Sequence, residues 1–469
     1  MKHTRRFTSG CTFLAIAGVL ACWISAFPAV AQQGQDAVYN SFGQVTNSPS
    51  FIDASMFAAS APNICGILHS ILIGGSYPAT GAVIDARGLP GTTGTSMTCT
   101  ASPWAGINNP LPSTILLPAG IIVIPTTWVL PSNTRLIGEG EGVPVYSSGN
   151  LVSAPGTWIK AMANGSLSSM IQFGSSSVCA SGVCSGISVE QLTLDGQAQA
   201  VHGIVNQFSQ TNTYVDHVTV YQILGTGLLI SNSGSSSATN SGPYTNITFD
   251  TGGYPGASST MCAQIIGTSG TRGIHGLRCK SETNDAQAGV LLDSSNNSIE
   301  DVNIVGFYDG ILVGSQASAQ SNVLLNIVGD TAAGNLPPVN VVHISSNNPV
   351  TDLSIMGVTN IVAPANGENS IKDDVTSTTL GDSNVAIYAL GESPGSGGGH
   401  SRFTTSPNAA HWTVGTAAPT ATSPTCSQGS LYSCTNGPNG AVNCSNGTSN
   451  AALWVCVPSG STTVWSAIK

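Results

Sequence analysis

The chain has 469 residues, only 7% of them charged, and a formal net charge of −10. An acidic surface repels nucleic acids and acidic membranes, so we expect neither as a partner. Gly accounts for 55 residues, and many glycines with few charges favour short strands and turns over helices.

The first 31 residues have the three parts of a secretory signal peptide. Basic residues lie among the first six, an apolar stretch runs from about Cys11 to Phe27, and Ala29 and Ala31 follow. We therefore predict a signal peptide over residues 1–31 and a secreted protein, periplasmic if the organism is Gram-negative; a membrane anchor is the alternative. No later segment is apolar enough to span a membrane. Cleavage would leave nine basic and 22 acidic residues.

Residues 32–113 are predicted to form an N-terminal capping segment. Asp53 is suited to capping a short helix, and apolar residues at Ile64, Ile67, Leu68, Ile71 and Leu72 recur at helical spacing. Such an amphipathic helix would close the open end of the domain that follows.

Residues 114–390 contain a repeated strand pattern. Each copy reads apolar, two variable residues, apolar, one variable residue, apolar, and copies begin at Val189, Val215, Tyr244, Ile274, Ile299 and Val350. A degenerate copy, Leu325 to Ile327, fills the gap, so the central residues are 192, 218, 247, 277, 302, 325 and 353. A period of 23 to 30 residues indicates a solenoid.

Four of these strands are followed by a glycine and an aliphatic residue, as at Gly203 and Gly289. Glycine allows the sharp corners between strands, and the period leaves no room for a helix in each repeat. The sequence therefore predicts an all-β fold, a right-handed parallel β-helix.

The C-terminal part changes composition. Residues 391–423 are rich in Gly, Ser, Pro and Thr and are predicted to be a linker. Residues 424–469 hold four cysteines and three aromatic residues and predict a small Cys-rich β module. End-capping, homo-oligomerisation and glycan contact remain open as its role.

Ten cysteines would remain in the mature chain, and an even number in an exported protein predicts disulfides. Pairing of neighbours in order would join Cys65 with Cys99, Cys179 with Cys184, and Cys262 with Cys279. Because no Cys-x-x-Cys pair is present, a zinc site is the weaker alternative.

Candidate site residues follow from the alternation of side chains along a strand. If Leu192 and Leu194 point inward, Thr193 and Asp195 point outward. Stacked rungs then build one column of Thr193, Thr219, Thr248, Arg278, Asn303, Asn326 and Ser354, and a second of Asp195, Tyr221, Asp250, Lys280, Val305, Val328 and Met356. His275 and Arg272 lie nearby in sequence.

Two catalytic interpretations use this patch. Asp195 and Asp250 would lie two rungs apart, roughly 9–10 Å, near the carboxylate separation of inverting glycosidases. Alternatively, Arg278 or Lys280 abstracts a proton beside a uronate carboxylate while the two aspartates hold calcium, as in a lyase. Tyr221 would stack on a sugar ring in either case. A purely structural origin, with a turn at Asp195 and a solvated Asp250–Lys280 pair, is the third possibility.

Other acidic motifs are set aside at this stage. Asp216 and His217 are adjacent, and adjacent residues of a regular strand face opposite ways; Glu300 and Asp301 are set aside for the same reason. Glu139 and Glu141 lie in a glycine-rich turn and are expected to be structural.

The chain resembles the pectate-lyase-like superfamily of secreted β-helix proteins, which includes family 28 glycoside hydrolases. The resemblance covers roughly residues 80–390 and is carried by residues 136–140 and 192–196, which look like early-rung signatures of that group. Arg278, Cys279 and Lys280 are similar to the Arg-Ile-Lys with which family 28 enzymes bind the substrate carboxylate.

These observations predict a secreted protein that acts on polysaccharide, a hydrolase or lyase of uronate-containing or other extracellular glycans. The catalytic candidates are Asp195 and Asp250, and the substrate-binding candidates are Tyr221, Arg278, Lys280 and His275. No metal site is assigned, although a lyase would call for calcium. A non-catalytic glycan-binding, adhesin-like or tailspike-like protein is the alternative.

Overall fold

The computed structural model describes most of residues 51–468. Residues 1–50 lie outside the described part, as do several loops, the longer ones being 232–240, 331–337, 361–368, 375–384, 393–402, 405–411, 416–430 and 435–443. The predicted signal peptide therefore lies outside the described residues, and so does Arg272.

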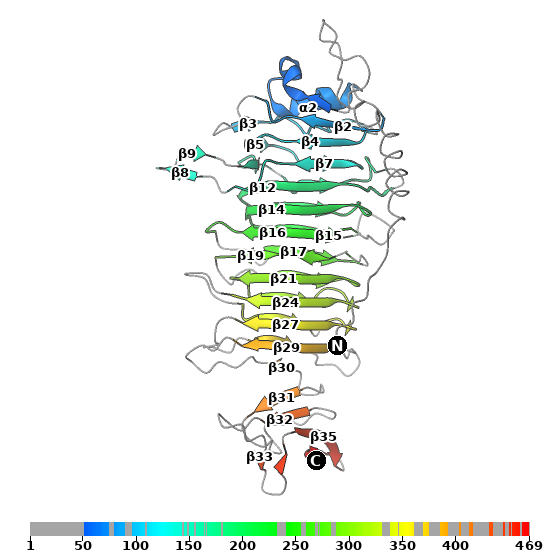
Figure 1. Ribbon diagram of the computed structural model, residues 1–469, viewed down its shortest axis with the longest axis vertical. Coiled ribbons are helices and arrows are strands. Elements are labelled where there is room, and N and C mark those ends of the chain that lie inside the picture. Colours follow the sequence, from blue (N-terminus) through cyan, green and yellow to red (C-terminus); the bar gives the residue numbers. More distant parts are fainter. Residues whose placement is uncertain are drawn as a thin grey trace, which may run out of the picture. The chain divides into compact units, whose positions relative to one another are not determined.

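Two long parallel sheets stack strand upon strand from β2 to β29 (Figure 1). The 16-stranded sheet contains β1 (Phe51–Asp53), β2 (Ala82–Asp85), β3 (Ser96–Thr98), β4 (Ser113–Leu116), β5 (Gly120–Ile124), β7 (Thr134–Ile137), β10 (Thr157–Ala161), β12 (Ser188–Gln199), β14 (Tyr214–Ile223), β16 (Tyr244–Asp250), β18 (Ile274–His275), β19 (Arg278–Lys280), β21 (Ser298–Val305), β24 (Val323–Gly329), β27 (Ser354–Asn360) and β29 (Ala386–Glu392).

The 10-stranded sheet contains β6 (Trp128–Leu130), β11 (Ser169–Phe173), β13 (His202–Asn206), β15 (Thr226–Ser231), β17 (Met261–Ile266), β20 (Ala288–Asp293), β22 (Asp309–Val313), β25 (Asn340–Ile344), β28 (Asn369–Asp373) and β30 (Phe403–Thr404). Smaller pairs are formed by β23 (Ala319–Gln320) with β26 (Val350–Thr351) and by β8 (Val145–Ser147) with β9 (Asn150–Ser153). Buried aliphatic side chains from both long sheets form one continuous core. The predicted parallel β-helix is confirmed, and its stacked strands begin before residue 114, at β1 and β2.

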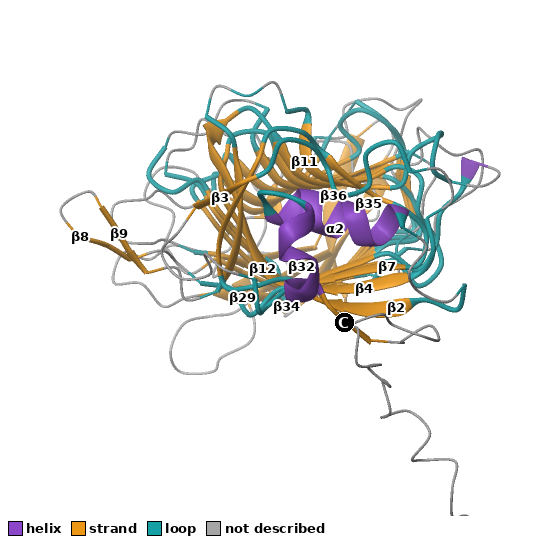
Figure 2. Cartoon of the chain, turned by 90° about the horizontal axis from the view of Figure 1, so that it is seen from above, coloured by secondary structure: helices purple, strands orange, loops and turns teal. Residues whose placement is uncertain are grey.

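A short helical segment closes the N-terminal end of the coil. Asp53 caps the 3-10 helix η1 (Ala54–Ser60), accepting a hydrogen bond from the Ser55 amide at 2.9 Å. Asn63 caps α2 (Ile64–Ile73) in the same way. The five apolar residues predicted at helical spacing are all buried and belong to the same core cluster as the first strands. Figure 2 shows α2 lying across the end of the coil.

Each central rung of the large sheet bends at one residue in the left-handed conformation. These residues are in register from rung to rung, and we call them the bend column: Gln191, His217, Asn246, Gly276, Asp301, Asn326 and Gly357. Gly, Asn and Asp tolerate this conformation best, which explains most of the column. Because a left-handed residue breaks the alternation of a strand, side chains on its two sides do not follow a simple in-and-out rule.

The register of two predicted rungs differs from the sequence pattern. Leu324 and Ile327 pair with Ile299 and Val302, so the rung centre is Ile327 rather than Leu325. In the next rung Val358 pairs with Ile327, so Val358 rather than Leu353 is the centre. Ile355 is the last apolar residue of the predicted copy, which starts at Val350, and the first apolar residue of the rung that the structure shows. The sequence pattern is therefore ambiguous at this rung. The first predicted column therefore continues from Asn303 to Val328 and Thr359, not to Asn326 and Ser354.

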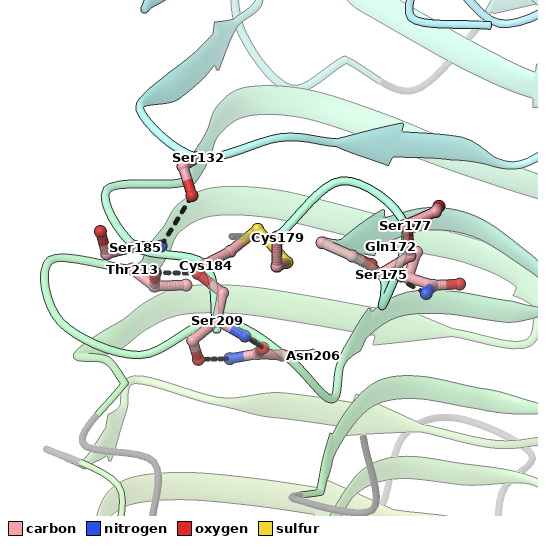
Figure 3. The surroundings of a disulfide bond; sticks show 11 residues. Ser132, Gln172, Ser175, Ser177, Cys179, Cys184, Ser185, Asn206, Ser209 and Thr213 are labelled. Atoms are coloured by element: carbon pink, nitrogen blue, oxygen red, sulfur yellow. Dashed lines mark hydrogen bonds between the residues drawn. A yellow bond between two sulfur atoms is a disulfide. The ribbon is translucent and has the colours of Figure 1, made fainter. Parts of the chain in front are cut away.

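All three predicted disulfides are present, joining Cys65 to Cys99, Cys179 to Cys184 and Cys262 to Cys279. Figure 3 shows the Cys179–Cys184 bond beside two polar contacts of the rung ends: Ser132 accepts from the Ser185 amide, and Asn206 and Ser209 exchange hydrogen bonds. The Cys262–Cys279 bond connects β17 to β19, one strand from each long sheet.

The C-terminal module is a separate small sheet with its own hydrophobic cluster. Strands β31 (Trp412–Gly415), β32 (Leu431–Cys434), β35 (Leu453–Ser459) and β36 (Thr462–Ile468) form a four-stranded sheet, and β33 (Cys444–Ser445) pairs with β34 (Asn450–Ala451). Tyr432, Trp454, Cys456 and Trp465 are buried together. The first strand of this sheet lies within the segment predicted to be a linker.

Within the part of the chain that the structure describes, no single helix is long and apolar enough to cross a membrane, and only η1 and α2, a sharply bent pair, reach that length and composition together.

Candidate functional site

The second predicted column forms a charge ladder that is in register from Asp195 to Val305, but Val328 pairs with Asn303 and so belongs to the first column. Asp195, Tyr221, Asp250 and Lys280 are in register on four successive strands, and Lys160 on β10 precedes them. The ladder thus runs Lys, Asp, Tyr, Asp, Lys. The structure brings four of the six predicted site residues into one row.

Asp195 lies in the predicted row, but its carboxylate is covered. Its side chain is only 3% exposed and lies 3.8 Å from Lys160 Nζ, and its Oδ1 accepts from the Gln197 amide at 2.8 Å. Burial raises the pKa of Asp195, against the opposing effects of Gln197 and Lys160. The expected accessibility of Asp195 is therefore wrong, because alternation gives the direction of a side chain but not what covers it. A polymer outside the coil does not reach this carboxylate.

Thr193, in the same strand, is also fully buried. Its hydroxyl contacts Gly142, which follows β7 in the glycine-rich turn of residues 138–142. Amides of that turn bond to the strand backbone of Glu190 and Gln191, so the turn covers this part of β12. A side chain at Gly138 would collide with the Gln191 carbonyl, which explains why glycine stands there.

The lower half of the ladder remains accessible. Asp250 is 28% exposed and Lys280 37%; their charged atoms lie 3.6 Å apart, and Lys280 also pairs with Glu282 at 2.8 Å. The Glu282 hydrogen bond is the largest cause that raises the pKa of Lys280. Tyr221 packs edge-on against Trp158 with ring centroids 5.9 Å apart, and burial raises the pKa of its hydroxyl. Lys280 is therefore a fully charged partner of two carboxylates, which argues against a proton-abstracting role.

An open groove with a volume of about 600 Å³ runs beside the bend column. Four successive rungs contribute to its lining, which consists of Asn246, Gly276, Arg278, Asp301, Val302, Asn303, Asn326, Val328 and Asp330. Asn326 donates to Asp301 at 2.7 Å and Asn303 donates to Asp330 at 3.2 Å. Amides and carboxylates thus alternate along the groove.

Arg278 is exposed in this groove. Its backbone carbonyl faces Cys262, and among the described residues its guanidinium has no hydrogen-bond or ion-pair partner. The other predicted binding residue, His275, is engaged: its Nδ1 lies 3.1 Å from Glu300 Oε2. Arg278 and His275 therefore have different neighbours although they are three residues apart.

Sequence reasoning missed a group of side chains at the upper end of the groove. His217 is in the left-handed bend conformation, so its ring folds back and its Nδ1 lies 2.9 Å from Asp216 Oδ1. Glu141 reaches from the glycine-rich turn to Thr219, whose hydroxyl donates to its Oε2. The expectation that Asp216 and His217 face opposite ways assumed a regular strand, and the contact between their side chains shows that this premise was wrong. The signal was present in the sequence, because the equivalent position is Asn, Asp or Gly in five of the other six rungs of the bend column.

Glu139 and Glu141 differ although both come from the same turn. Glu139 accepts a hydrogen bond from the Ala119 amide at 3.1 Å, which is a structural contact as expected. In the part of the chain that the structure describes, no group of three or more His, Cys, Asp or Glu side chains is placed to hold a metal ion.

Comparison with known proteins adds little to these observations. No protein-family model and no curated protein sequence matches the chain. Among solved structures, it is similar to the A-module of the mannuronan C-5 epimerase AlgE6 of Azotobacter vinelandii, with 17% sequence identity over 60% of this chain and 87% of that chain and a TM-score of 0.27. The chain is a parallel β-helix by its own strand pairing, and a similarity at this level says nothing of its activity.

Proposed function

We propose that the protein is a secreted enzyme that binds an extended polysaccharide along the groove beside the bend column and cleaves it. The observation that carries the proposal is the groove itself, which crosses four rungs at about 4.8 Å per rung. A cleft of that length, lined by amides and carboxylates, offers many donors and acceptors for sugar hydroxyls. Val328, which is half-buried, adds apolar surface for the face of a sugar ring.

The substrate class follows from Arg278. An exposed guanidinium with no partner among the described residues is suited to a carboxylate, which it binds with two parallel hydrogen bonds. The carboxylates Asp301 and Asp330 in the same groove would repel a densely anionic polymer. A polysaccharide in which uronates alternate with neutral sugars meets both conditions.

The experiment is a screen of the purified mature protein on plant and bacterial polysaccharides, with and without calcium, that records new reducing ends and the absorbance of unsaturated uronates. Reducing ends alone indicate hydrolysis, and the absorbance indicates elimination. The Asp250→Asn variant is included in the screen because the charge ladder, rather than the groove, is the alternative catalytic site.

Arg278→Ala tests the groove, with Arg87→Ala as the matched control because Arg87 is an exposed arginine paired only with Asp85 on β2 among the described residues. We expect Arg278→Ala to raise KM on uronate-containing substrates and to leave KM on neutral ones unchanged. Binding without cleavage on every polysaccharide would contradict the proposal and favour a non-catalytic glycan-binding protein.

A further inference from the structure

The column of side chains just before the bend contains three carboxylates, and Asp216 differs from the other two. Glu190, Asp216, Thr245, His275 and Glu300 are in register on successive strands. Both oxygens of Glu190 accept from Arg135, and both oxygens of Glu300 are engaged, by Ser298 and His275. Glu190 and Glu300 are therefore committed to holding neighbouring side chains.

Asp216 is held by one oxygen only. Its Oδ1 accepts from Thr245 Oγ1 at 2.5 Å, from His217 Nδ1 at 2.9 Å and from Asn246 Nδ2 at 3.2 Å. Its Oδ2 has no hydrogen-bond partner among the described residues, and the side chain is 34% exposed. Three donors on one oxygen fix the orientation of the carboxylate and leave the other oxygen available to a water molecule.

Glu141, which comes from the glycine-rich turn, is also held through only one of its carboxylate oxygens. Its Oε2 accepts from Thr219 Oγ1 at 2.5 Å, and its Oε1 has no partner among the residues that the structure describes. Thr219 lies three residues after Asp216 on β14, so the Cα atoms of these two residues are roughly 10 Å apart or less. Desolvation is the largest cause that raises the pKa of Glu141, and the charge of Asp216 is a further one, so the two carboxyl groups are close enough to interact. Glycosidases use carboxyl pairs about 5–5.5 Å or about 6.5–9.5 Å apart.

The pair lies at one end of the groove. Asn246, which donates to Asp216, also lines the groove, and Arg278 lies on the strand beside it in the sheet. A polysaccharide bound along the groove would therefore extend to the two free carboxylate oxygens.

The environments of the two carboxyl groups are opposite. Desolvation of its carboxyl group raises the pKa of Glu141, although the residue as a whole is exposed and Thr219 opposes the shift. Burial would also raise the pKa of Asp216, but the hydrogen bonds from Thr245, His217 and Asn246 outweigh it and lower the pKa. Two nearby carboxyl groups with such contrasting environments are typical of an acid and a base.

We propose that Glu141 and Asp216 are the acid and base of a glycoside hydrolase and that His217 is a positioning residue that holds Asp216. The proposal rests on the proposed function and adds its chemistry. Protonated Glu141 gives its proton to the glycosidic oxygen as the bond from that oxygen to the anomeric carbon breaks. Asp216 takes a proton from the water whose oxygen bonds to the same carbon. Exchange of both protons with solvent restores the enzyme.

The pH profile is the first test. Cleavage needs Glu141 protonated and Asp216 ionised, so the rate falls below a pKa lower than 3.8 and again above a pKa higher than 4.5. The other titratable groups that face the pair are Glu190 on β12, His217 on β14 and His275 on β18. We expect an acidic optimum whose acid limb disappears in Asp216→Asn and whose alkaline limb disappears in Glu141→Gln.

Substitution is the second test, measured as reducing ends released from the best substrate of the screen. Glu141→Gln and Asp216→Asn are each expected to lower kcat by about 10²–10⁴-fold. The matched controls are Glu139→Gln from the same turn and Glu190→Gln from the same column, and neither should lower kcat more than a few-fold. Circular dichroism melting of all four variants separates misfolding from loss of chemistry.

Chemical rescue completes the experiment. In Asp216→Ala, sodium azide supplies an anion that needs no base, so we expect azide to restore turnover and to yield a glycosyl azide detectable by mass spectrometry. His217→Asn should shift the acid limb toward higher pH because Asp216 loses a donor. Full activity of folded Glu141→Gln or Asp216→Asn would overturn this assignment and leave the proposed function standing, whereas a wild-type protein that cleaves no polysaccharide would overturn both.

Discussion

His343, on β25 of the 10-stranded sheet, connects neighbouring rungs through its side chain. Its Nδ1 lies 2.8 Å from Asp309 Oδ2 and its Nε2 lies 2.9 Å from Asp374 Oδ2. A carboxylate only accepts hydrogen bonds, so both ring nitrogens must carry protons and the ring is an imidazolium. Burial alone would lower the pKa of His343, but Asp309 and Asp374 outweigh it, against Lys372, and raise the pKa.

This arrangement predicts that the last rungs are more stable in acid. The folded pKa lies above the unfolded value of 6.5, so the stabilisation is complete below the unfolded pKa and is lost as pH rises through the folded pKa. We expect the difference in free energy of unfolding between the wild type and His343→Asn to be larger at about pH 5 than at about pH 9. Urea unfolding at both pH values measures it, and an equal difference would contradict the imidazolium.

We expect substitutions of Asp195 and Lys160, which form an ion pair, to lower the free energy of unfolding by different amounts. Lys160 is 25% exposed and reaches water when Asp195 loses its charge, whereas Asp195 stays buried when Lys160 is removed. We therefore expect Lys160→Met to cost several kcal/mol of stability, about 3, and Asp195→Asn to cost about 1. Thermal unfolding of both variants tests the order.

The same Asp195→Asn variant tests the site assignment. Because its carboxylate is covered, we expect cleavage of polysaccharide to be unchanged. A variant that folds like the wild type and has lost activity would return Asp195 to the catalytic centre.

At the scale of the element, the left-handed residues of the bend column change the direction of the polar side chains on the strands of the 16-stranded sheet. A left-handed residue costs roughly 1–2 kcal/mol for side chains other than Gly, Asn or Asp. At the bend of β14 this conformation brings the Asp216 and His217 side chains together, which regular alternation would separate. Four residues of the bend column line the groove, so the groove follows the bends from rung to rung.

Asn326 is the clearest place to measure the cost of a bend. Its φ is 54° and its side chain donates to Asp301. Asn326→Val should lower the free energy of unfolding by about 2 kcal/mol, since strain adds to the lost hydrogen bond. Asn326→Gly loses the same hydrogen bond without the strain and should cost less, as measured by urea unfolding. Equal costs for the two variants would show that the bend stores no conformational penalty.

At the scale of the whole molecule, the coil and the C-terminal module have separate hydrophobic clusters. Each rung of a solenoid is stabilised mainly by its neighbours, and the module depends on Tyr432, Trp454 and Trp465. Tyr432 and Trp465 pack with ring centroids 5.8 Å apart.

We therefore expect a substitution in either unit to act within that unit. Trp465→Ala should cost about 3–5 kcal/mol in the module, and hydrogen exchange should rise from Trp412 to Ile468 and stay unchanged in the coil. Trp128→Ala, at a fully buried position of the coil, is the matched control and should show the converse. Faster exchange throughout the chain after either substitution would show that the two units unfold together.

The sequence by itself determined the parallel coil and its helical cap, because these depend on local periodicity. It did not fix the cysteine pairing, although joining neighbours in order matches the three disulfides of the structure. It also placed Tyr221, Asp250 and Lys280 in one row, since register follows from the repeat. Only the tertiary structure decided which polar side chains are accessible. The turn at residues 138–142 buries Thr193 and brings Glu141 to Thr219, a residue 78 positions later, and the bend at His217 turns its ring toward Asp216. Coverage and bends depend on contacts between distant segments and on backbone conformation, and the in-and-out pattern of a strand encodes neither.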